Sequence, residues 1–535
     1  MCMSCRQGSV MSKSKHKNRK EEAGAGAPVV EAVIFIGASA VSMMVAESRG
    51  HEFRVLDVLS QPVEVVYDIF RNNSISRENA DRCVQIVRGY NELLDEYRRV
   101  GEVTVRLLAT NMLMDANLLD LFVNRMRISC GLKLEVMDDG EMTRLIYQHL
   151  QHMLHKHAEL AKRRLLVVHV GPGNTRLLLL DRGRITYYAN YRLGTHRTSA
   201  SIGSAELDHS GNEVSIIRNR IRSTVEQMRH DAEETLPGPP DAMVVYGPDF
   251  HRMAAPSLEG EVVSVESLGE LATQISLTPL VQRMERYGED YASVRALLPT
   301  LLISQSVARE FEPQTIMMPA EDFPHSFLRS LMPSQVGTQV LEEEVIHFSM
   351  LLANRYRVDR GHCQQVRHLS CSLFDQLQEL HRMDRHDRLL LKVAAILHEV
   401  GTFVSPKRHH KHSQYLILNS EIFGLSRHDI EIVGLLARYH RRGVPSEEER
   451  CYAELDDEDR LRVQKLSAIL RVADALDRAH ARRIGGFKVK QGKRRLELLV
   501  PGVHDLTLEN AALSTKGQLF TDVFGYDVLL VPDVG

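Results

Sequence analysis

The last third of the chain carries side chains that could hold a metal ion. Imidazole nitrogens and carboxylate oxygens follow one another there, in an order that several helices could bring together. The candidate ligands are His362, His398, Glu399, His410, His440 and Asp474. This mixture suits manganese, iron, zinc or magnesium, and such an ion can turn a bound water into a nucleophile. A single histidine is more often a structural or surface residue, so the prediction of a divalent metal depends on the whole set.

Asp474 is the candidate ligand that most needs a partner. It lies next to an apolar stripe with helical spacing that includes Leu470 and Leu476. A carboxylate buried on such a face is costly unless a metal ion or a cationic side chain compensates it. Arg438 and Arg471 are the alternatives to a metal as that partner.

Basic residues interleave with these candidate ligands. We call Lys407, Arg408, Lys411 and Arg441 the basic strip, which Arg442 continues. Runs of charge usually form a solvated face, but cations gathered around candidate ligands suit a polyanion. Polyphosphate, guanosine phosphates and a nucleic-acid backbone all have this character. Because no aromatic residues interleave with the strip and the net charge is −3, nucleic acid is not the expected partner.

The composition is that of a soluble protein with several domains. At 535 residues the chain exceeds the roughly 250–300 residues that one hydrophobic core serves. Hydrophobic residues make up 43% and charged residues 26%, and no apolar run approaches the roughly 18 residues of a membrane span. The first 20 residues contain no apolar signal stretch, and seven scattered cysteines fit reduced thiols, so we expect a cytoplasmic protein. The lone pair Cys2 and Cys5 is not expected to bind zinc.

Strands and helices alternate in the first part of the chain, and helices dominate later. Residues 1–28 have the composition of a disordered basic tail. Predicted strands at 32–47, broken by Gly37, and at 103–109, 165–170, 176–180 and 242–246, with a helix at 115–130, indicate an α/β architecture to about residue 330. From about residue 335 the apolar spacing predicts a helical bundle. Residues 484–535 return to short strands, which predicts a small β-rich cap.

Four segments in order resemble the exopolyphosphatase/guanosine pentaphosphatase (Ppx/GppA) family. They are residues 35–39, 109–117, 140–147 and 167–175. The resemblance covers nearly the whole chain apart from the tail, and it implies a two-lobed actin-like ATPase fold: α/β in lobe I (29–155) and lobe II (156–334), then mostly α. Family members cleave terminal phosphates from polyphosphate or guanosine pentaphosphate and usually form dimers. The resemblance therefore implies these ligands and a homodimer, with no membrane partner.

The resemblance assigns phosphate binding to two glycine turns. The first contains Gly37, and the second contains Gly171, Gly173, Asn174 and Thr175. Backbone N–H groups of such turns cradle phosphate oxygens. In the second turn the middle residue is a proline instead of the family's glycine, so one N–H group is absent.

Most of the family's catalytic residues are replaced in this sequence. Hydrolysis of a phosphoanhydride needs a cation held by carboxylates and a base for the attacking water. The family's two loop aspartates fall on Phe35 and His169, its water-activating glutamate on Met142 and its phosphate-binding arginine on Met114. Glu141 is the remaining acid and the candidate catalytic base, although it points about 100° away from position 142 on a helix.

The helical part resembles the HD superfamily of metal-dependent phosphohydrolases, which arrange histidines and aspartates around one or two cations. The motif L-H-E-V-G at residues 397–401 also occurs in long Ppx/GppA proteins, where this domain is thought to support polyphosphate binding more than a second hydrolysis. Glu399 stands where the HD pattern has an aspartate, so the ligand arm is one methylene longer. We therefore assign residues 335–483 to an HD-type helical domain.

The sequence predicts a Ppx/GppA-like protein that binds polyphosphate or a phosphorylated nucleotide, with a degenerate N-terminal catalytic site. Any hydrolysis would then take place in the HD-type domain. Two alternatives stay open: an active exopolyphosphatase with rearranged ligands, and a non-catalytic scaffold that neither binds nor cleaves phosphate.

Overall fold

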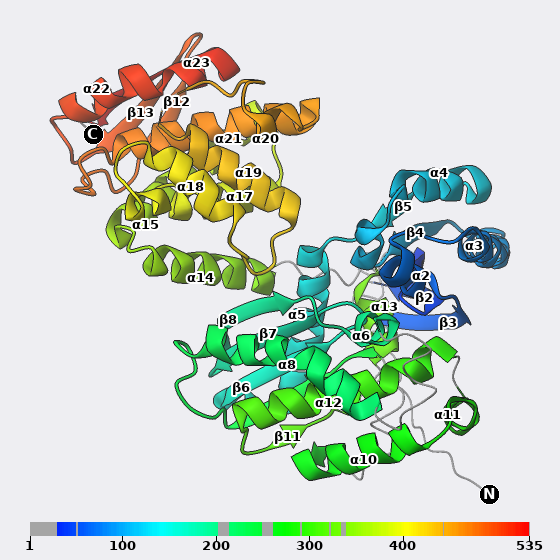
Figure 1. Ribbon diagram of the computed structural model, residues 1–535. Helices are drawn as coiled ribbons and strands as arrows, with labels where there is room; N and C mark the ends of the chain where they lie inside the picture. The colour runs from blue at the N-terminus through cyan, green and yellow to red at the C-terminus, as the bar shows by residue number, and fades with distance from the viewer. Residues whose placement is uncertain are drawn as a thin grey trace, which may run out of the picture.

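The computed structural model describes residues 29–49, 52–201, 213–248, 261–288, 291–319, 323–332, 339–441 and 443–533. The predicted tail at 1–28, with Cys2 and Cys5, lies outside these residues, as do Arg442 and the predicted boundary at 334–335. The described residues form three sheets and a helical domain (Figure 1). No helix among them is both long and apolar enough to cross a membrane.

Lobe I is a five-stranded sheet in the order β3-β2-β1-β4-β5. Its strands are β1 (Val29–Ile36), β2 (Ala40–Arg49), β3 (Glu52–Pro62), β4 (Val103–Ala109) and β5 (Leu134–Val136). The run predicted as one strand broken at Gly37 is an antiparallel hairpin of β1 and β2 that turns at residues 37–39. The lobe's helices are α2 (Val65–Asn72), α3 (Arg77–Arg98) and α4 (Leu119–Cys130), with the 3-10 helix η2 (Asn111–Asp115). The helix predicted from residue 115 therefore begins at Leu119, after a 3-10 turn.

Lobe II is a six-stranded sheet in the order β10-β11-β9-β6-β7-β8. Its strands are β6 (Arg164–Val170), β7 (Thr175–Asp181), β8 (Arg184–Tyr191), β9 (Ala242–Tyr246), β10 (Val262–Val263) and β11 (Ile316–Met317). Strands β6 and β7 form the predicted hairpin around the second glycine turn. The helices are α6 (Thr195–Ala200), α8 (Glu213–Ala232), α10 (Val265–Leu277), α11 (Leu280–Tyr287), α12 (Tyr291–Phe311) and α13 (Phe323–Ser330). Helix α5 (Asp139–Lys156), at the end of lobe I, shares one core with both sheets.

Strand β6 is apolar on both faces because helices cover both sides of the sheet. Leu165 and Val167 belong to the same core as residues of α5, whereas Leu166 and Val168 pack in a core with α8 and α12. The glycine turn joins the end of β6 to the start of β7, and Gly173 in it packs against Met112 and Phe70 of lobe I.

The helical domain contains eight α-helices among the described residues. They are α14 (Gln339–Arg355), α15 (Arg360–Gln376), α16 (Gln378–His381), α17 (Arg385–Leu397), α18 (His409–Leu418), α19 (Arg427–Tyr439), α20 (Arg450–Ala453) and α21 (Asp457–Leu476). Helices α17 and α19 begin in capping boxes, Asp384 with Asp387 and Ser426 with Asp429, which satisfy the first backbone N–H groups. Helix α17 ends just before His398, and helix α19 ends just before His440. The two imidazoles therefore lie at the C-terminal ends of capped helices.

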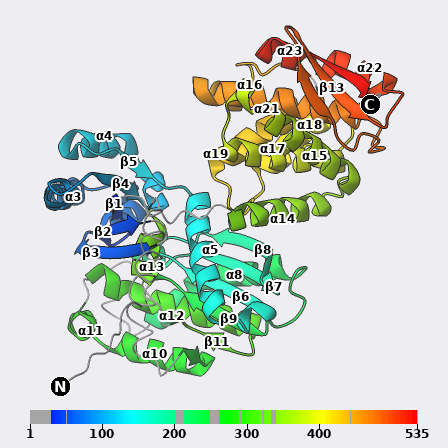
Figure 2. The same ribbon diagram turned by 180° about the vertical axis from the view of Figure 1, so that it is seen from behind.

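The C-terminal segment forms a three-stranded sheet with two helices. Its elements are β12 (Lys488–Gln491), β13 (Arg495–Pro501), α22 (Thr507–Lys516), α23 (Gln518–Phe524) and β14 (Asp527–Asp533). Strands β13 and β14 are parallel, and a parallel pair needs a crossover connection, which α22 and α23 supply. The segment is thus more helical than the sequence pattern predicts. Leu498, Leu513 and Phe520 share one core with the helical bundle, so the segment packs as part of it (Figure 2).

Residues 421–426 of the helical domain contact both lobes. The ring of Phe423 packs edge-on against Tyr147 at 5.1 Å and Tyr188 at 5.5 Å between centroids. Leu425 lies so close to the backbone of Gly140 that a Cβ atom there would collide with its carbonyl. This loop, together with α14, therefore joins the helical domain to the lobes.

Candidate functional site

Four imidazoles and one carboxylate converge at the centre of the helical domain. We call His362, His398, His409, His440 and Asp474 the histidine centre. All five are buried. Ligand atoms of His362, His398 and Asp474 lie within 4.8 Å of one another, and the His398 and His440 rings are 4.9 Å apart. Helices α15, α17, α18, α19 and α21 therefore bring together residues that are far apart in the sequence.

Backbone carbonyls fix which nitrogen of three imidazoles faces inward. Nδ1 of His398 lies 2.9 Å from Ala395 O, and Nδ1 of His440 lies 2.7 Å from Ala437 O. Nδ1 of His409 lies 3.2 Å from the carbonyl of residue 406. Because a carbonyl only accepts, each Nδ1 must donate, and a neutral imidazole then presents an Nε2 lone pair. Metal-binding histidines are held in the same way by their outer nitrogen.

The inward nitrogens have few protein partners. Nε2 of His362 and Nε2 of His398 are buried and make no hydrogen bond with the described residues. Burial lowers the pKa of His398, and it lowers the pKa of His440 well below the ordinary value, with His398 adding to the effect. Both imidazoles are therefore neutral at pH 7, which is the state that can bind a metal.

His362 is oriented by a carboxylate that the sequence reasoning missed. Its Nδ1 donates to Asp477 Oδ2 at 2.9 Å, and its Nε2 lies 3.7 Å from Asp474 Oδ1. Burial opposes charging of this imidazole, but the hydrogen bond to Asp477 and the nearby Glu399 and Asp474 carboxylates raise its pKa overall. Asp477 follows Asp474 by three residues at the end of α21, a spacing that places both on one helix face and could have revealed it.

Glu399 belongs to a neighbouring group of ligand atoms. It lies with His362 and His480, again within 4.8 Å. The His480 ring stacks on His362 with centroids 3.7 Å apart, and its Nδ1 lies 3.2 Å from Asp359 Oδ2. The longer glutamate arm thus reaches the outer side of His362, whereas Asp474 lies on the inner side.

His409, and not His410, meets the histidine centre. Nε2 of His409 lies 3.2 Å from Nε2 of His440. Helix α18 begins at His409, and the next residue points elsewhere, because successive residues are about 100° apart on a helix. The sequence assignment of His410 as a ligand is therefore corrected by one position.

His410 instead lies among the basic residues. Burial lowers its pKa to about 4, and Arg438, His409, Lys411 and Arg441 add to the decrease. Lys407, Arg408 and Lys411 are exposed, and no ion pair joins them to any residue that the structure describes. Arg438, by contrast, donates to Glu449 Oε2 at 2.8 Å. The basic strip therefore keeps most of its charge free on one surface beside the histidine centre.

Asp474 has a cationic partner that is neither of the expected arginines. Lys516 of α22 donates from Nζ to Asp474 Oδ2, and both side chains are less than a tenth exposed. Arg471 is buried but donates to the backbone carbonyls of Tyr439 and Gly443. Nothing in the sequence near residue 516 indicates this contact, because it depends on how α22 packs against α21.

The second glycine turn, residues 171–175, packs tightly against lobe I and α6. We call these residues the glycine loop. A Cβ atom at Gly173 would collide with the Met112 side chain and lie 2.8 Å from Phe70. The N–H groups of His196 and Arg197, at the start of α6, both donate to Pro172 O at 3.0 Å. Donors that could face a phosphate are thus engaged by the loop's own carbonyl.

The four residues that the resemblance aligns with the family's catalytic residues are part of the core or exposed. The Phe35 ring packs edge-on against Phe327 with centroids 5.1 Å apart, and Met142 packs against the same core. His169 is buried, and burial holds its pKa well below the usual range. Met114 is 57% exposed. None of these four side chains offers a carboxylate or a cation at neutral pH.

Glu141 stabilises the start of α5. Its Oε2 accepts the N–H of Asp138 at 3.1 Å, while Asp138 Oδ1 accepts the N–H of Glu141 at 2.9 Å. Burial raises the pKa of the Glu141 carboxyl, against the effect of that backbone hydrogen bond. The carboxylate is therefore engaged in a capping box, which the sequence D-D-G-E preceding the helix could have predicted.

Asp139, one residue from the cap, is the carboxylate that lies between the lobes. Its Oδ1 accepts from Arg176 Nη2 at 2.8 Å and from Asn111 Nδ2 at 2.7 Å, with Asn190 Nδ2 at 3.4 Å. The backbone N–H of Asn190 also donates to Glu421 Oε2 at 3.2 Å. We call Asn111, Asp139, Arg176 and Asn190, with the glycine loop, the interlobe site.

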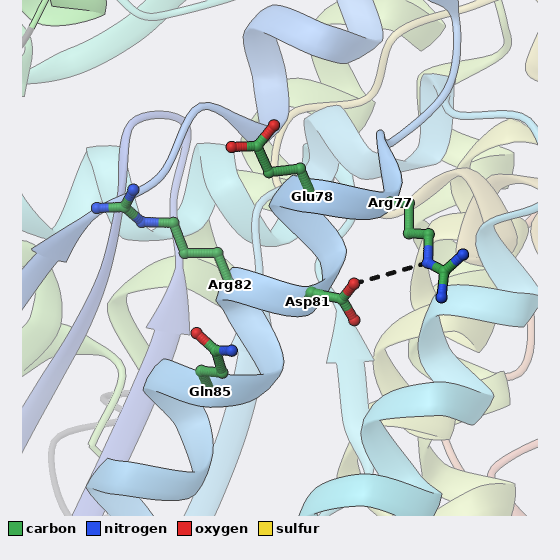
Figure 3. Close-up of a pocket in the computed structure, with 5 residues that line it drawn as sticks. All are labelled: Arg77, Glu78, Asp81, Arg82 and Gln85. Carbon is green, nitrogen blue, oxygen red and sulfur yellow. Dashed lines mark ion pairs between the residues drawn. The ribbon is translucent and has the colours of Figure 1, made fainter.

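A hollow of about 630 Å³ on lobe I lies outside both of these sites. Figure 3 shows that Arg77, Glu78, Asp81, Arg82 and Gln85 line it, all on α3. Arg77 and Asp81 form an exposed ion pair at 3.8 Å, typical of a solvated helix face. A surface made by one helix with opposite charges already paired does not indicate a ligand.

Comparison with known proteins identifies the family. The Ppx/GppA phosphatase family profile matches residues 44–321, and Ppx/GppA phosphatase, domain III, matches residues 349–516. The first match covers more than half of the chain, so the chain belongs to the Ppx/GppA phosphatase family. The second match ends at Lys516 and crosses the predicted boundary at residue 484, in line with the shared core.

Curated relatives and solved structures have low identity to this chain. Guanosine-5'-triphosphate,3'-diphosphate pyrophosphatases of Vibrio vulnificus and Pseudoalteromonas translucida are 22% and 20% identical, over 83% and 77% of this chain and 88% and 80% of theirs. An exopolyphosphatase structure from Cytophaga hutchinsonii is 14% identical with a TM-score of 0.46, covering 56% of this chain and 97% of its own. A family member from Aquifex aeolicus is 16% identical with a TM-score of 0.44, covering 57% and 97%.

Proposed function

We propose that this Ppx/GppA family protein binds polyphosphate or a phosphorylated guanosine nucleotide through its helical domain and does not hydrolyse it at the interlobe site. The class of ligand is taken from the names of similar proteins, which are a guanosine-5'-triphosphate,3'-diphosphate pyrophosphatase and an exopolyphosphatase. The observation that carries the proposal is the contrast between the two sites. At the interlobe site, Phe35, Met142 and His169 stand where the family resemblance places acids, whereas the helical domain keeps unpaired cations beside a set of inward-facing nitrogens.

Four features support the absence of hydrolysis at the interlobe site. A phenylalanine, a methionine and a neutral histidine stand where the family resemblance places acids, so these three positions offer no carboxylate to hold a cation. Side chains of lobe I fill the space against Gly173. The carboxylate of the interlobe site, Asp139, already accepts hydrogen bonds from Arg176 and Asn111. Glu141, the candidate base, is engaged in the helix cap.

The basic strip is the proposed polyanion surface. Its three exposed cations have no carboxylate to neutralise them among the described residues. Burial lowers the pKa of the neighbouring His410 to about 4, and Lys411 is among the cations that add to the decrease. A phosphate chain meeting several such cations gains from counterion release, which weakens steeply with salt. The phosphate-binding assignment of Gly37 in the β1–β2 turn, and of Gly171, Gly173, Asn174 and Thr175 in the closely packed glycine loop, stays a prediction.

The histidine centre fits a divalent transition metal. Nε2 of His362 and of His398 are buried without a protein partner and face the Asp474 carboxylate, which is the donor set such an ion prefers. His362, His398 and Asp474 would hold the ion, with His440 and His409 beside them and Glu399 on the outer side. When bound, the metal would supply a water of lowered pKa as a nucleophile. Here Asp477 orients His362, and backbone carbonyls orient His398 and His440.

Binding of polyphosphate to the full chain tests the proposed surface. Replacing Lys407, Arg408 and Lys411 together by alanine should weaken binding by about tenfold or more at low salt, and the dependence on salt should become shallower. Lys488, Lys490 and Lys493, all exposed on and after β12, provide a triple-alanine control of equal charge, although Lys490 Nζ lies 3.8 Å from Glu497 Oε2. An unchanged dissociation constant for the strip variant, or an equal loss in the control, would show that the strip is an ordinary solvated face.

A further inference from the structure

Lys516 places a positive charge inside the centre that the metal would occupy. It is the last residue of α22, in the C-terminal segment, and its Nζ donates to Asp474 Oδ2. The Asp474 oxygen that faces His362 is the other one, Oδ1. One carboxylate therefore faces the ligand nitrogens on one side and an ammonium on the other.

The packing leaves Lys516 little freedom to move away. Helix α22 lies against α21, which carries Asp474, and Leu513 of α22 is buried in the common core. The Lys516 side chain is 9% exposed and that of Asp474 is 7% exposed. A buried ammonium without its carboxylate is strongly unfavourable, so the pair is expected to persist when no metal is present.

Two effects lower the affinity for a divalent ion that binds beside this pair. It is repelled by the ammonium at short range, where the low dielectric of the interior strengthens charge interactions. It also shares the Asp474 carboxylate with a donor that already uses one oxygen. The first effect arises from the charge of Lys516, whereas the second arises from its hydrogen bond to Asp474.

We propose that Lys516 is an internal counter-cation of the histidine centre, which compensates Asp474 in the metal-free protein and weakens the affinity of the centre for divalent metal ions. This inference depends on the metal site proposed above. It adds a regulatory element from outside the ligand set: the C-terminal segment determines, through one charge, how much metal the centre takes up. Removing the charge should convert a weak site into a tight one.

Metal titration of the full chain tests this inference. Manganese and zinc are titrated separately, by calorimetry, into the wild type, Lys516→Gln, Lys516→Arg and the control Lys392→Gln. Gln keeps a donor to Asp474 without the charge, and Arg keeps the charge. Lys392 is a comparable half-buried lysine of the same domain, whose Nζ lies 3.7 Å from Glu342. Lys516→Gln should bind at least about tenfold tighter than the wild type, and the other two should match the wild type.

Each other outcome contradicts the inference in a recognisable way. Equal affinities of the wild type and Lys516→Gln would leave the metal site standing and remove the role of Lys516. Tighter binding by both Lys516→Gln and Lys516→Arg would show that packing and not charge matters. No binding by any of the proteins would overturn the proposed metal site itself. Should Lys516→Gln unfold without metal, saturating zinc must restore its thermal transition, and failure to do so would contradict the proposal.

Discussion

Arg176 donates from Nη2 to Asp139 Oδ1 at 2.8 Å, and this ion pair joins lobe II to lobe I beside the glycine loop. The two partners differ in burial: the Arg176 side chain is 2% exposed, whereas that of Asp139 is 57% exposed. Nε of Arg176 makes no hydrogen bond with the described residues. The buried cation therefore depends on Asp139, while Asp139 keeps water and two asparagines as further partners.

This asymmetry predicts unequal effects of removing either partner. Asp139→Ala should lower the free energy of unfolding by about 2 kcal/mol, less than for a fully buried pair because the carboxylate is half-exposed. Arg176→Met should change it by under about 1 kcal/mol, since it leaves a carboxylate that water can solvate. Urea unfolding of both variants measures the difference, and a more costly Arg176→Met would contradict this description of the pair.

Asp474 and Lys516 should behave as a coupled pair in metal-free protein. Asp474→Ala leaves the ammonium buried and uncompensated, so it should cost about 3 kcal/mol. The decrease in the free energy of unfolding is thus larger than expected if Asp474 were only a metal ligand. The double variant Asp474→Ala/Lys516→Met should recover most of that stability. Denaturant unfolding in the presence of a chelator measures both, and a double variant less stable than Asp474→Ala would refute the coupling.

Glu421 predicts a pH dependence of stability. Its pKa is raised to about 7, chiefly because the surrounding protein withdraws the carboxyl from water, with Asp139 adding to the increase. The folded state therefore holds a proton that the unfolded state releases at lower pH, and this carboxyl stabilises the fold less as the pH rises from about 4.5 to about 7.

Glu421→Gln removes this titration. Its advantage over the wild type should grow between about pH 4.5 and pH 7 and stay constant above, reaching under about 1 kcal/mol because the residue is partly exposed. The stability of both proteins is compared across that pH range. A difference that does not change with pH would show that Glu421 titrates normally.

The sequence predicted regular elements well where patterns are local. The glycine hairpin at 164–181 and the strand at 242–246 were predicted because their apolar runs and turn residues are contiguous. The family and its fold followed from short ordered motifs. The C-terminal segment was predicted as too rich in strands, because the crossover between parallel strands is a non-local requirement that no short window contains.

The sequence predicts which types of residue form the candidate site, but not every position or contact in it. His362, His398 and Asp474 were found because residue types in order are visible in a sequence. The sequence indicated His410, whereas His409 lies in the histidine centre. The register of α18 is set by packing and not by the histidines themselves. Lys516 and Arg176 could not be found, because each is defined by contact with a residue from another part of the chain. The homodimer stays a prediction.

The interlobe site is proposed not to hydrolyse phosphoanhydrides. The direct measurement is phosphate release from polyphosphate and from guanosine pentaphosphate by the full chain, with magnesium and with manganese, beside Lys407→Ala/Arg408→Ala/Lys411→Ala and Asp474→Ala. We expect no magnesium-dependent release at the interlobe site, so any activity that is observed must disappear in Asp474→Ala. Robust release by the wild type that persists in Asp474→Ala and is lost in Asp139→Ala would show an active interlobe site and contradict the proposed function.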